Sequence, residues 1–440
     1  MPYSSIGENN KDAMQKKIPT SQPMCPLLFI IILLFNSSNA IDNAHFYRAN
    51  YTWQEPRLPN DWLSSAEVSL AGGSTAKGRN ASGQTTNILN IYGPESIRDL
   101  ATNVPLLDPT NPLDAILIAL EALPADNTFA TLELTGKFSI TESTINAYQN
   151  LINGFFIQAY LPLRYLKISN IHYNDLSPET GNPNRSNPEW IAFLQNFPAI
   201  LNRYGIDPLH NSRAAGCGDL SILAGWAGNY VDTYYLDFID VSAKVGGLFP
   251  TGRTQNIHNP FELPLGYNGH YGVPLKFDVS IGLYEWITTG LHIGALFLFE
   301  NKQTIRMKTS TTQNGFITLT TGDATIDPGT LWDFEVYFTA DHFFKGLSLS
   351  LGYSFNQKDS DFITPHNQIT FNTETVNKDQ LFKSWNMQVL HVMAEYDFAK
   401  KYEDIGPRIC LFYNHVLNGK RIFSTHMIGT YIGIDIAYVY

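Results

Sequence analysis

Many segments of the chain alternate apolar and polar residues with a period of two. The last segment, MIGTYIGIDIAYVY (427–440), puts a row rich in isoleucine on one side, including Ile428, Ile432 and Ile434. The other side carries Tyr431, Asp435 and small residues. A period of two predicts β-strands, because successive strand side chains point to opposite faces.

Twelve segments of this kind are predicted strands, most of them about 10 to 17 residues long. Strands of soluble domains average about 5 to 6 residues, whereas a tilted strand that crosses a membrane needs about 9 to 11. The predicted strands lie near 64–73, 129–140, 155–171, 217–230, 234–249, 272–284, 287–301, 331–341, 346–357, 384–399, 406–417 and 423–440.

The connections between these segments alternate between long and short, except that the last one, at Leu417–Lys420, is short where a long one is expected. Those after the first, third, fifth, seventh and ninth segments run from roughly 22 to 55 residues, and those after the even-numbered ones from about 2 to 14. Long loops on one rim and tight turns on the other are typical of outer-membrane barrels. We therefore predict an all-β fold, a transmembrane antiparallel barrel of about 12 strands (range 10–14), with long extracellular loops that carry short helices.

The two longest connections, about 74–128 and 172–216, contain helical spacing at 111–123 and 187–205. These helices could cap the barrel mouth, fold into the lumen or pack on the outer leaflet.

The N-terminus has the features of a secretory signal. Lys16 and Lys17 precede the apolar run PLLFIIILLF (26–35), which small residues follow up to Ala40. The run is shorter than the roughly 20 residues that a helix needs to span a bilayer. We predict a signal peptide over 1–40, with translation starting at Met1 or Met14, and a single barrel domain over 41–440 in the outer membrane of a Gram-negative-type bacterium.

The composition excludes several function classes. The chain is 44% hydrophobic and 13% aromatic, which argues against disorder, and its net charge of −11 argues against a nucleic-acid partner. Cys217 and Cys410 follow the predicted signal peptide. Two cysteines form no disulfide framework, so we expect unpaired packing residues, with a single bridge as the alternative.

The chain ends inside its last predicted strand. A closed barrel must pair this strand with the first one, because an open edge in lipid leaves backbone groups unsatisfied. Tyr438 and Tyr440 are then expected in the periplasmic aromatic belt. The aromatic terminus is similar to the signal read by the barrel-assembly machinery, although Asp435 stands where that pattern has glycine. Expected partners are this machinery, membrane lipid, lipopolysaccharide and a small solute.

Fourteen charged residues fall on the predicted lumen side of the strands. They fit a network of hydrogen-bonded ion pairs that fills the barrel, or a polar permeation path, and the two can coexist. The residues are Glu133, Lys137, Arg164, Asp219, Asp240, Lys244, Lys276, Asp278, Glu300, Asp333, Glu335, Glu395, Arg408 and Asp435. We expect the path to be lined by Asp219, Asp240, Lys244, Lys276, Asp278, Asp333 and Glu335.

Aromatic residues of the third long loop could admit a solute or simply pack that loop. They are Phe249, Phe261, Tyr267 and Tyr271.

Catalytic and metal motifs are missing from the sequence. It contains no HxxxH, CxxC or GxSxG spacing and shows no convincing serine beside a histidine. We predict no catalytic, cofactor or metal site, and no enzyme. An outer-membrane hydrolase remains a weaker alternative.

The motifs GCGD (Gly216, Gly218 and Asp219) and PTG (Pro250, Thr251 and Gly252) are followed by a predicted glycine-rich strand pair. Through these motifs, residues 213–300 resemble the outer-membrane family associated with the meta-pathway of phenol degradation. The resemblance implies a β-barrel channel for aromatic or other hydrophobic molecules, related in outline to long-chain fatty-acid channels. We predict passive uptake of small solutes, hydrophobic or aromatic ones included. The alternative is a structural or surface-interaction barrel with a plugged lumen.

Overall fold

The computed structural model describes residues 62–102, 104, 107–122, 131–151, 153–176, 187–207, 209, 211–231, 236–284, 286–344, 346–398 and 405–438. The predicted signal peptide and Tyr440 lie outside these residues. The side chain of Tyr438 also lies outside them, so its place in an aromatic belt stays a prediction.

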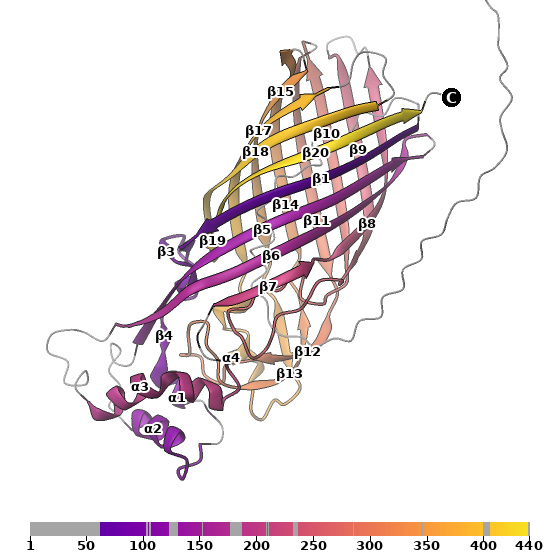
Figure 1. Cartoon of the computed structure of the whole chain (residues 1–440). Helices are drawn as coiled ribbons and strands as arrows, with labels where there is room; N and C mark the ends of the chain where they lie inside the picture. Colours follow the sequence, from indigo (N-terminus) through magenta and orange to yellow (C-terminus); the bar gives the residue numbers. More distant parts are fainter. Residues whose placement is uncertain are drawn as a thin grey trace, which may run out of the picture. The chain divides into compact units, whose positions relative to one another are not determined.

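Twelve antiparallel strands form a closed barrel, as the sequence predicts (Figure 1). The first strand pairs with the last, from Trp62 opposite Tyr438 to Ser74 opposite His426, and this pairing closes the barrel. The barrel strands are β1 (Trp62–Thr75), β5 (Thr131–Asn150), β6 (Phe155–Asp175), β8 (Leu220–Val231), β9 (Phe238–Phe249), β10 (Gly272–Leu283), β11 (Ile287–Leu298), β14 (Leu331–Phe344), β15 (Leu347–Lys358), β17 (Trp385–Asp397), β18 (Ile405–Lys420) and β20 (His426–Tyr438).

Alternation along the strands separates an outward apolar face from an inward one. In β20, Ile428 and Ile432 are 60% and 62% exposed, whereas Met427 and Tyr431 on the other face of the strand are buried. Leu411 of β18 and Val68 of β1 continue the exposed apolar row on the neighbouring strands. The isoleucine-rich side of the last segment therefore faces outward, as predicted.

The connections alternate in length, and we call the two ends of the barrel the long-loop rim and the short-turn rim. One predicted boundary was wrong: β5 continues ten residues past the expected end at 140, to Asn150. Alternating burial persists through this extension, with Glu142 and Thr144 buried, so it pairs with β1 and β6. The connection from β5 to β6 is consequently a tight turn.

The predicted strand at 217–230 is interrupted. β7 (Ser212–Cys217) pairs with the half of β6 nearer the long-loop rim, and β8 pairs with the half nearer the short-turn rim. Gly218 and Asp219 lie at the break, and the Gly218 N–H donates to the Pro162 carbonyl at 2.7 Å. The break thus falls inside the sequence motif GCGD.

The long loops fold into a structured cap, which lies at the long-loop rim in Figure 1. Two predicted helices are confirmed here, α2 (Pro112–Glu121) and α3 (Pro188–Arg203), and α1 (Ile97–Thr102) lies beside α2. Arg203 binds the buried Asp114 carboxylate at 2.6 Å, and this hydrogen bond holds the pKa of Asp114 near 2. The helices, β5 and β6 share one apolar core that includes Trp190 and Phe138.

Small sheets complete the cap. One contains β12 (Asn301–Arg306), β13 (Thr321–Asp327) and β16 (Phe362–Pro365), and the other contains β2 (Lys77–Arg79), β3 (Thr85–Asn87) and β19 (Ile422–Phe423). β4 (Glu95–Ser96) adds to β5, and α4 (Thr373–Val376) precedes β17. β12 and β13 pair antiparallel, with irregular chain between Arg306 and Thr321.

Arg306 ties the cap together through backbone carbonyls. Its guanidinium donates to five backbone carbonyls at 2.7 to 3.2 Å, which belong to the end of α3, the third long loop and the segment before β13. The acceptors are Tyr204, Gly205, Ile257, Thr318 and Leu319.

Three of the fourteen charges expected in the lumen lie elsewhere. Glu133 and Lys137 point outward on β5, because Leu132, Leu134 and Phe138 take the inward side to pack beneath the cap. Glu300 lies beyond the end of β11.

Cys217 and Cys410 are both free, with Cys217 exposed and Cys410 buried. No helix within the described ranges is long and apolar enough to cross a membrane.

Candidate functional site

Side chains fill much of the barrel interior. Lys244 on β9, His292 on β11, Glu335 on β14 and His391 on β17 all point inward and are 4%, 0%, 1% and 1% exposed. A water-filled pore would leave such residues accessible. The described interior is therefore packed rather than open over the middle of the barrel.

One polar network connects four neighbouring strands. The Asp278 carboxylate accepts from Ser242 Oγ at 2.9 Å, lies 3.8 Å from Lys244 Nζ and bonds to His292 Nδ1. His292 Nε2 lies 3.3 Å from Asp333 Oδ2. Three residues expected from the sequence, Lys244, Asp278 and Asp333, are thus joined through a histidine that the sequence did not single out.

Asp240 lies in a separate contact closer to the short-turn rim, on β9. It accepts from Asn229 Nδ2 at 2.5 Å and from Ser280 Oγ at 3.4 Å. These two partners lie on the neighbouring strands β8 and β10.

A second charged cluster lies in the same half of the barrel as the chain terminus. Arg408 on β18 is 3.2 Å from Glu67, 3.7 Å from Glu395 and 3.5 Å from Asp435. The Tyr431 hydroxyl also hydrogen-bonds the Glu395 carboxylate. This cluster cross-links four strands at the closure of the barrel, and it places Asp435, the departure from the usual terminal pattern, in an ion pair.

A serine does lie beside a histidine, contrary to the sequence analysis. Ser354 Oγ is 2.8 Å from His391 Nε2, and His391 Nδ1 is 3.0 Å from Asn414 Oδ1. Three adjacent strands, β15, β17 and β18, supply these residues. Pairing of distant strands creates the contact, so no local motif could have revealed it.

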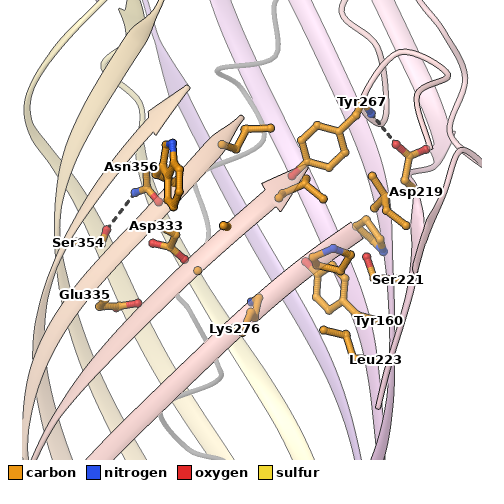
Figure 2. Close-up of a pocket in the computed structure, with 18 of the residues that line it drawn as sticks. Tyr160, Asp219, Ser221, Leu223, Tyr267, Lys276, Asp333, Glu335, Ser354 and Asn356 are labelled. Atoms are coloured by element: carbon orange, nitrogen blue, oxygen red, sulfur yellow. Dashed lines mark hydrogen bonds between the residues drawn. The ribbon is translucent and has the colours of Figure 1, made fainter. Parts of the chain in front are cut away.

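A cavity of about 200 Å³ occupies the half of the barrel nearer the long-loop rim. Tyr160, Leu223 and Tyr267 line one side, and Figure 2 shows Lys276, Asp333 and Glu335 on the facing strands. Four of the seven expected residues line this cavity, namely Asp219, Lys276, Asp333 and Glu335. Asp240, Lys244 and Asp278 are not among its lining residues.

The third long loop, 250–271, closes the cavity from the cap side. Residues 261–266 have no regular secondary structure, yet every one of them is buried. Arg164 of β6 donates to the Leu265 carbonyl at 2.6 Å and to Glu142 at 2.5 Å. We call residues 250–271 the roof loop.

The residues of the two sequence motifs meet where the roof loop leaves and rejoins the wall. Asp219 Oδ1 accepts from the Gly252 N–H at 2.8 Å, and Oδ2 accepts from the Tyr267 N–H at 2.5 Å, as Figure 2 shows for Tyr267. Thr251 Oγ1 donates to the Gly218 carbonyl at 2.7 Å. A side chain at Gly266 would overlap the Asp219 carboxylate, with a Cβ only 2.1 Å from Oδ1.

The four aromatic loop residues fall into different environments. Tyr267 lines the cavity and Phe261 is buried in the cap core. Phe249 and Tyr271 are 41% and 53% exposed at the ends of the loop. The structure thus brings only Tyr267 to the cavity. In the part of the chain that the structure describes, no group of three His, Cys, Asp or Glu residues could hold a metal ion.

Comparison with known proteins finds similarity only among solved structures. No family model matches the chain, and neither does any curated protein. An outer membrane channel from Pseudomonas putida F1 is similar over 87% of this chain and 97% of its own, at 12% identity and a TM-score of 0.45. A mutant of the TodX monoaromatic hydrocarbon channel is similar over 92% of this chain and 96% of its own, at 8% identity and a TM-score of 0.37.

A Pseudomonas aeruginosa FadL homologue is also similar, over 86% of this chain and 90% of its own, at 9% identity and a TM-score of 0.29. Likenesses at this level identify no solute. The resemblance of residues 213–300 to the phenol-pathway family stays a prediction.

Proposed function

We propose that this protein is an outer-membrane channel for small solutes, closed in the state described here. The exposed apolar rows of the barrel support the membrane location. Outward residues from Ile436 to Ile428 cover about 26 Å along β20 at roughly 3.3 Å per residue. This corresponds to about 20 Å along the membrane normal at a tilt near 40°, comparable to the apolar band of outer-membrane barrels.

The cavity beneath the roof loop is the observation that carries the proposed function. A cavity of about 150 Å³ lined by apolar groups holds one benzene ring, so about 200 Å³ suits a single-ring solute. Tyr160, Leu223 and Tyr267 offer apolar surface, while Lys276 and Asp333 offer polar contacts. The site therefore favours a small solute with an apolar body and a polar group.

The packed interior argues for a selective path over general diffusion. A solute must displace the roof loop on one side and pass the network around Asp278 on the other. Along this path we expect the solute to pass seven charged lumen residues, namely Asp219, Asp240, Lys244, Lys276, Asp278, Asp333 and Glu335. The alternative, a structural barrel with a plugged lumen, has the same packing but assigns the cavity no ligand.

Ligand binding by the purified barrel tests this proposal. Equilibrium dialysis of phenol and toluene would be run against the folded chain and against Ser221→Trp, which fills the cavity from β8. Ile222→Trp is the matched control, because Ile222 is the next residue along β8, points outward and is 42% exposed. We expect the parent and Ile222→Trp to bind and Ser221→Trp not to bind. Equal retention of either solute by all three proteins would refute a cavity site.

We also propose that the protein has no hydrolase activity, despite the contact between Ser354 and His391. Ser354 lies on a barrel strand directly opposite Glu335, whose carboxyl group is 3.9 Å from His391 Nε2. Acyl transfer needs donors around the developing oxyanion. Backbone N–H groups of a barrel wall are instead used in the strand ladder. The polar contact is better explained as part of the packed interior.

The expected partners follow from the same location. We propose that β20 is the segment recognised by the barrel-assembly machinery, and that membrane lipid and lipopolysaccharide surround the exposed apolar rows.

A further inference from the structure

A row of polar and basic side chains crosses six neighbouring strands near the long-loop rim. The strand register pairs His426 of β20 with Ser74 of β1, Ser74 with Ser139 of β5, Ser139 with Lys167 of β6, and Lys167 with Arg213 of β7. On the other side of β20, the rings of His415 and His426 stack with centroids 4.4 Å apart. We call His415, His426, Ser74, Ser139, Lys167 and Arg213 the basic row. Figure 1 shows these strands side by side.

The row brings positive charges of neighbouring strands close together. Lys167 and Arg213 are directly opposite each other, and Lys137 lies two residues from Ser139 on the same outward side of β5. No ion pair of these three residues is recorded among the described residues. The outward carboxylate of β5, Glu133, is four residues beyond Lys137 and accepts from Asn90.

Like charges at directly opposite positions destabilise a strand pair. The arrangement therefore favours an anion bound between the side chains. Arginine matches phosphate with two parallel hydrogen bonds, lysine adds a point charge, and the serine hydroxyls between the cations are further donors.

The β20 end of the row lies at the height expected for lipid headgroups. The ten steps along β20 from Ile436 to His426 rise about 33 Å along the strand, which is about 25 Å along the membrane normal at a tilt near 40°. Exposed apolar residues, including Ile428 and Leu411, occupy the interval below. The row therefore marks the upper edge of the apolar band on this flank.

The opposite flank has a different chemistry at the same rim. There Phe249 ends β9, Tyr271 precedes β10 and Phe299 follows β11, and these residues are 41%, 53% and 54% exposed. Aromatic side chains of this kind suit any membrane interface. The restriction of the basic row to one flank therefore indicates a specific anionic ligand rather than a general preference for the interface.

We propose that the basic row, with Lys137 beside it, binds the phosphate groups of a phosphorylated glycolipid in the outer leaflet. This inference rests on the proposed outer-membrane location and is independent of the solute cavity. Five strands from β20 to β7 span about 19 Å at roughly 4.8 Å per strand, which is wide enough for more than one phosphate. The acyl chains would then lie along the exposed apolar residues below the row.

Native mass spectrometry of the folded chain with lipid A tests the proposal. The variant Lys167→Gln with Arg213→Gln removes two charges from the row. The control, Lys302→Gln with Lys378→Gln, removes two exposed charges from the cap. Each basic residue near an anionic surface contributes about 1 kcal/mol, so the row variant should bind lipid A about 30-fold more weakly. The control should bind like the parent.

Two further arms identify the ligand chemistry. The affinity of the parent for dephosphorylated lipid A should be no higher than the affinity of the row variant for intact lipid A. Inorganic phosphate at millimolar concentration should not displace lipid A; displacement would indicate a site for free phosphate and overturn the glycolipid assignment. Equal affinity of the parent and the row variant would also overturn it. Heat-modifiable gel mobility and solute binding, measured on the same samples, report separately on folding and on the cavity.

Discussion

Asp219 is expected to hold the roof loop closed. Its carboxylate is 4% exposed and accepts from the backbone N–H groups of Gly252 and Tyr267, which lie near the two ends of the loop. Replacing Asp219 with alanine removes both acceptors at once. The change leaves the strand pairings of β8 with β6 and β9 intact, because these pairings begin after the break at Gly218.

The size of the effect follows from the two hydrogen bonds. Each bond to a charged acceptor contributes about 1.5 to 3 kcal/mol, so their loss weakens docking of the roof loop by about 3 to 6 kcal/mol. Water in the cavity can replace part of this stabilisation, which makes the lower figure the better guide. About 3 kcal/mol corresponds to a roughly 150-fold increase in the ratio of open to closed loop.

Single-channel recording in planar bilayers measures that ratio. We expect rare, brief openings from the parent and frequent openings from Asp219→Ala. Asp219→Asn should lie between them, because the amide keeps one acceptor oxygen and replaces the other with a donor. Asp240→Ala is the matched control, since Asp240 lies in the lumen and hydrogen-bonds Asn229 and Ser280 of the barrel wall. The reasoning fails if Asp219→Ala opens no more often than Asp240→Ala.

Three other predictions concern the cap and the interior. Arg306→Leu should make the cap at least tenfold more sensitive to proteinase K, because five backbone carbonyls lose their donor; unchanged sensitivity would contradict the role of Arg306. Glu95, outside the barrel wall, accepts from the Phe316 and Ile317 N–H groups, and burial raises its pKa from 4.5 to about 8. Between these pH values the folded cap binds a proton that the unfolded cap lacks, so its stability should fall as pH rises towards 8. Proteolysis should therefore be faster at pH 9 than at pH 6, and Glu95→Gln should remove the difference; an equal difference in the variant would exclude Glu95 as its source. A fluorophosphonate should not label Ser354. Labelling of Ser354 that is lost in His391→Ala would instead support hydrolase activity.

The barrel itself could be predicted from the sequence because its constraints are local. Alternation along each strand and the contrast between long loops and tight turns are visible without knowing any partner strand. The C-terminal segment illustrates this, since its outward and inward rows are as expected. The prediction failed where the apolar face of a strand does not face lipid. On the part of β5 near the long-loop rim the apolar side packs against the cap, so Glu133 and Lys137 point outward and not into the lumen as predicted.

The site could be predicted only in part, because alternation gives the direction of a side chain but not its partner. The lumen carboxylates were expected, whereas His292 and His391 acquire their polar contacts only through the pairing of β11 with β10 and β14, and of β17 with β15 and β18. The roof loop, rich in glycine, proline and asparagine, has the composition of a surface loop. Its burial depends on Asp219 and Arg164, which are distant in sequence and bind its backbone.

The central claim is that the cavity beneath the roof loop lies on a solute path across the outer membrane. Uptake of radiolabelled phenol and toluene by cells that produce the parent, Ser221→Trp or Ile222→Trp tests this most directly, with equal amounts of heat-modifiable barrel confirmed in the outer membrane. We predict faster uptake with the parent and Ile222→Trp than with Ser221→Trp, whose uptake should match that of cells without the protein. Equal uptake with the parent and Ser221→Trp would contradict the claim.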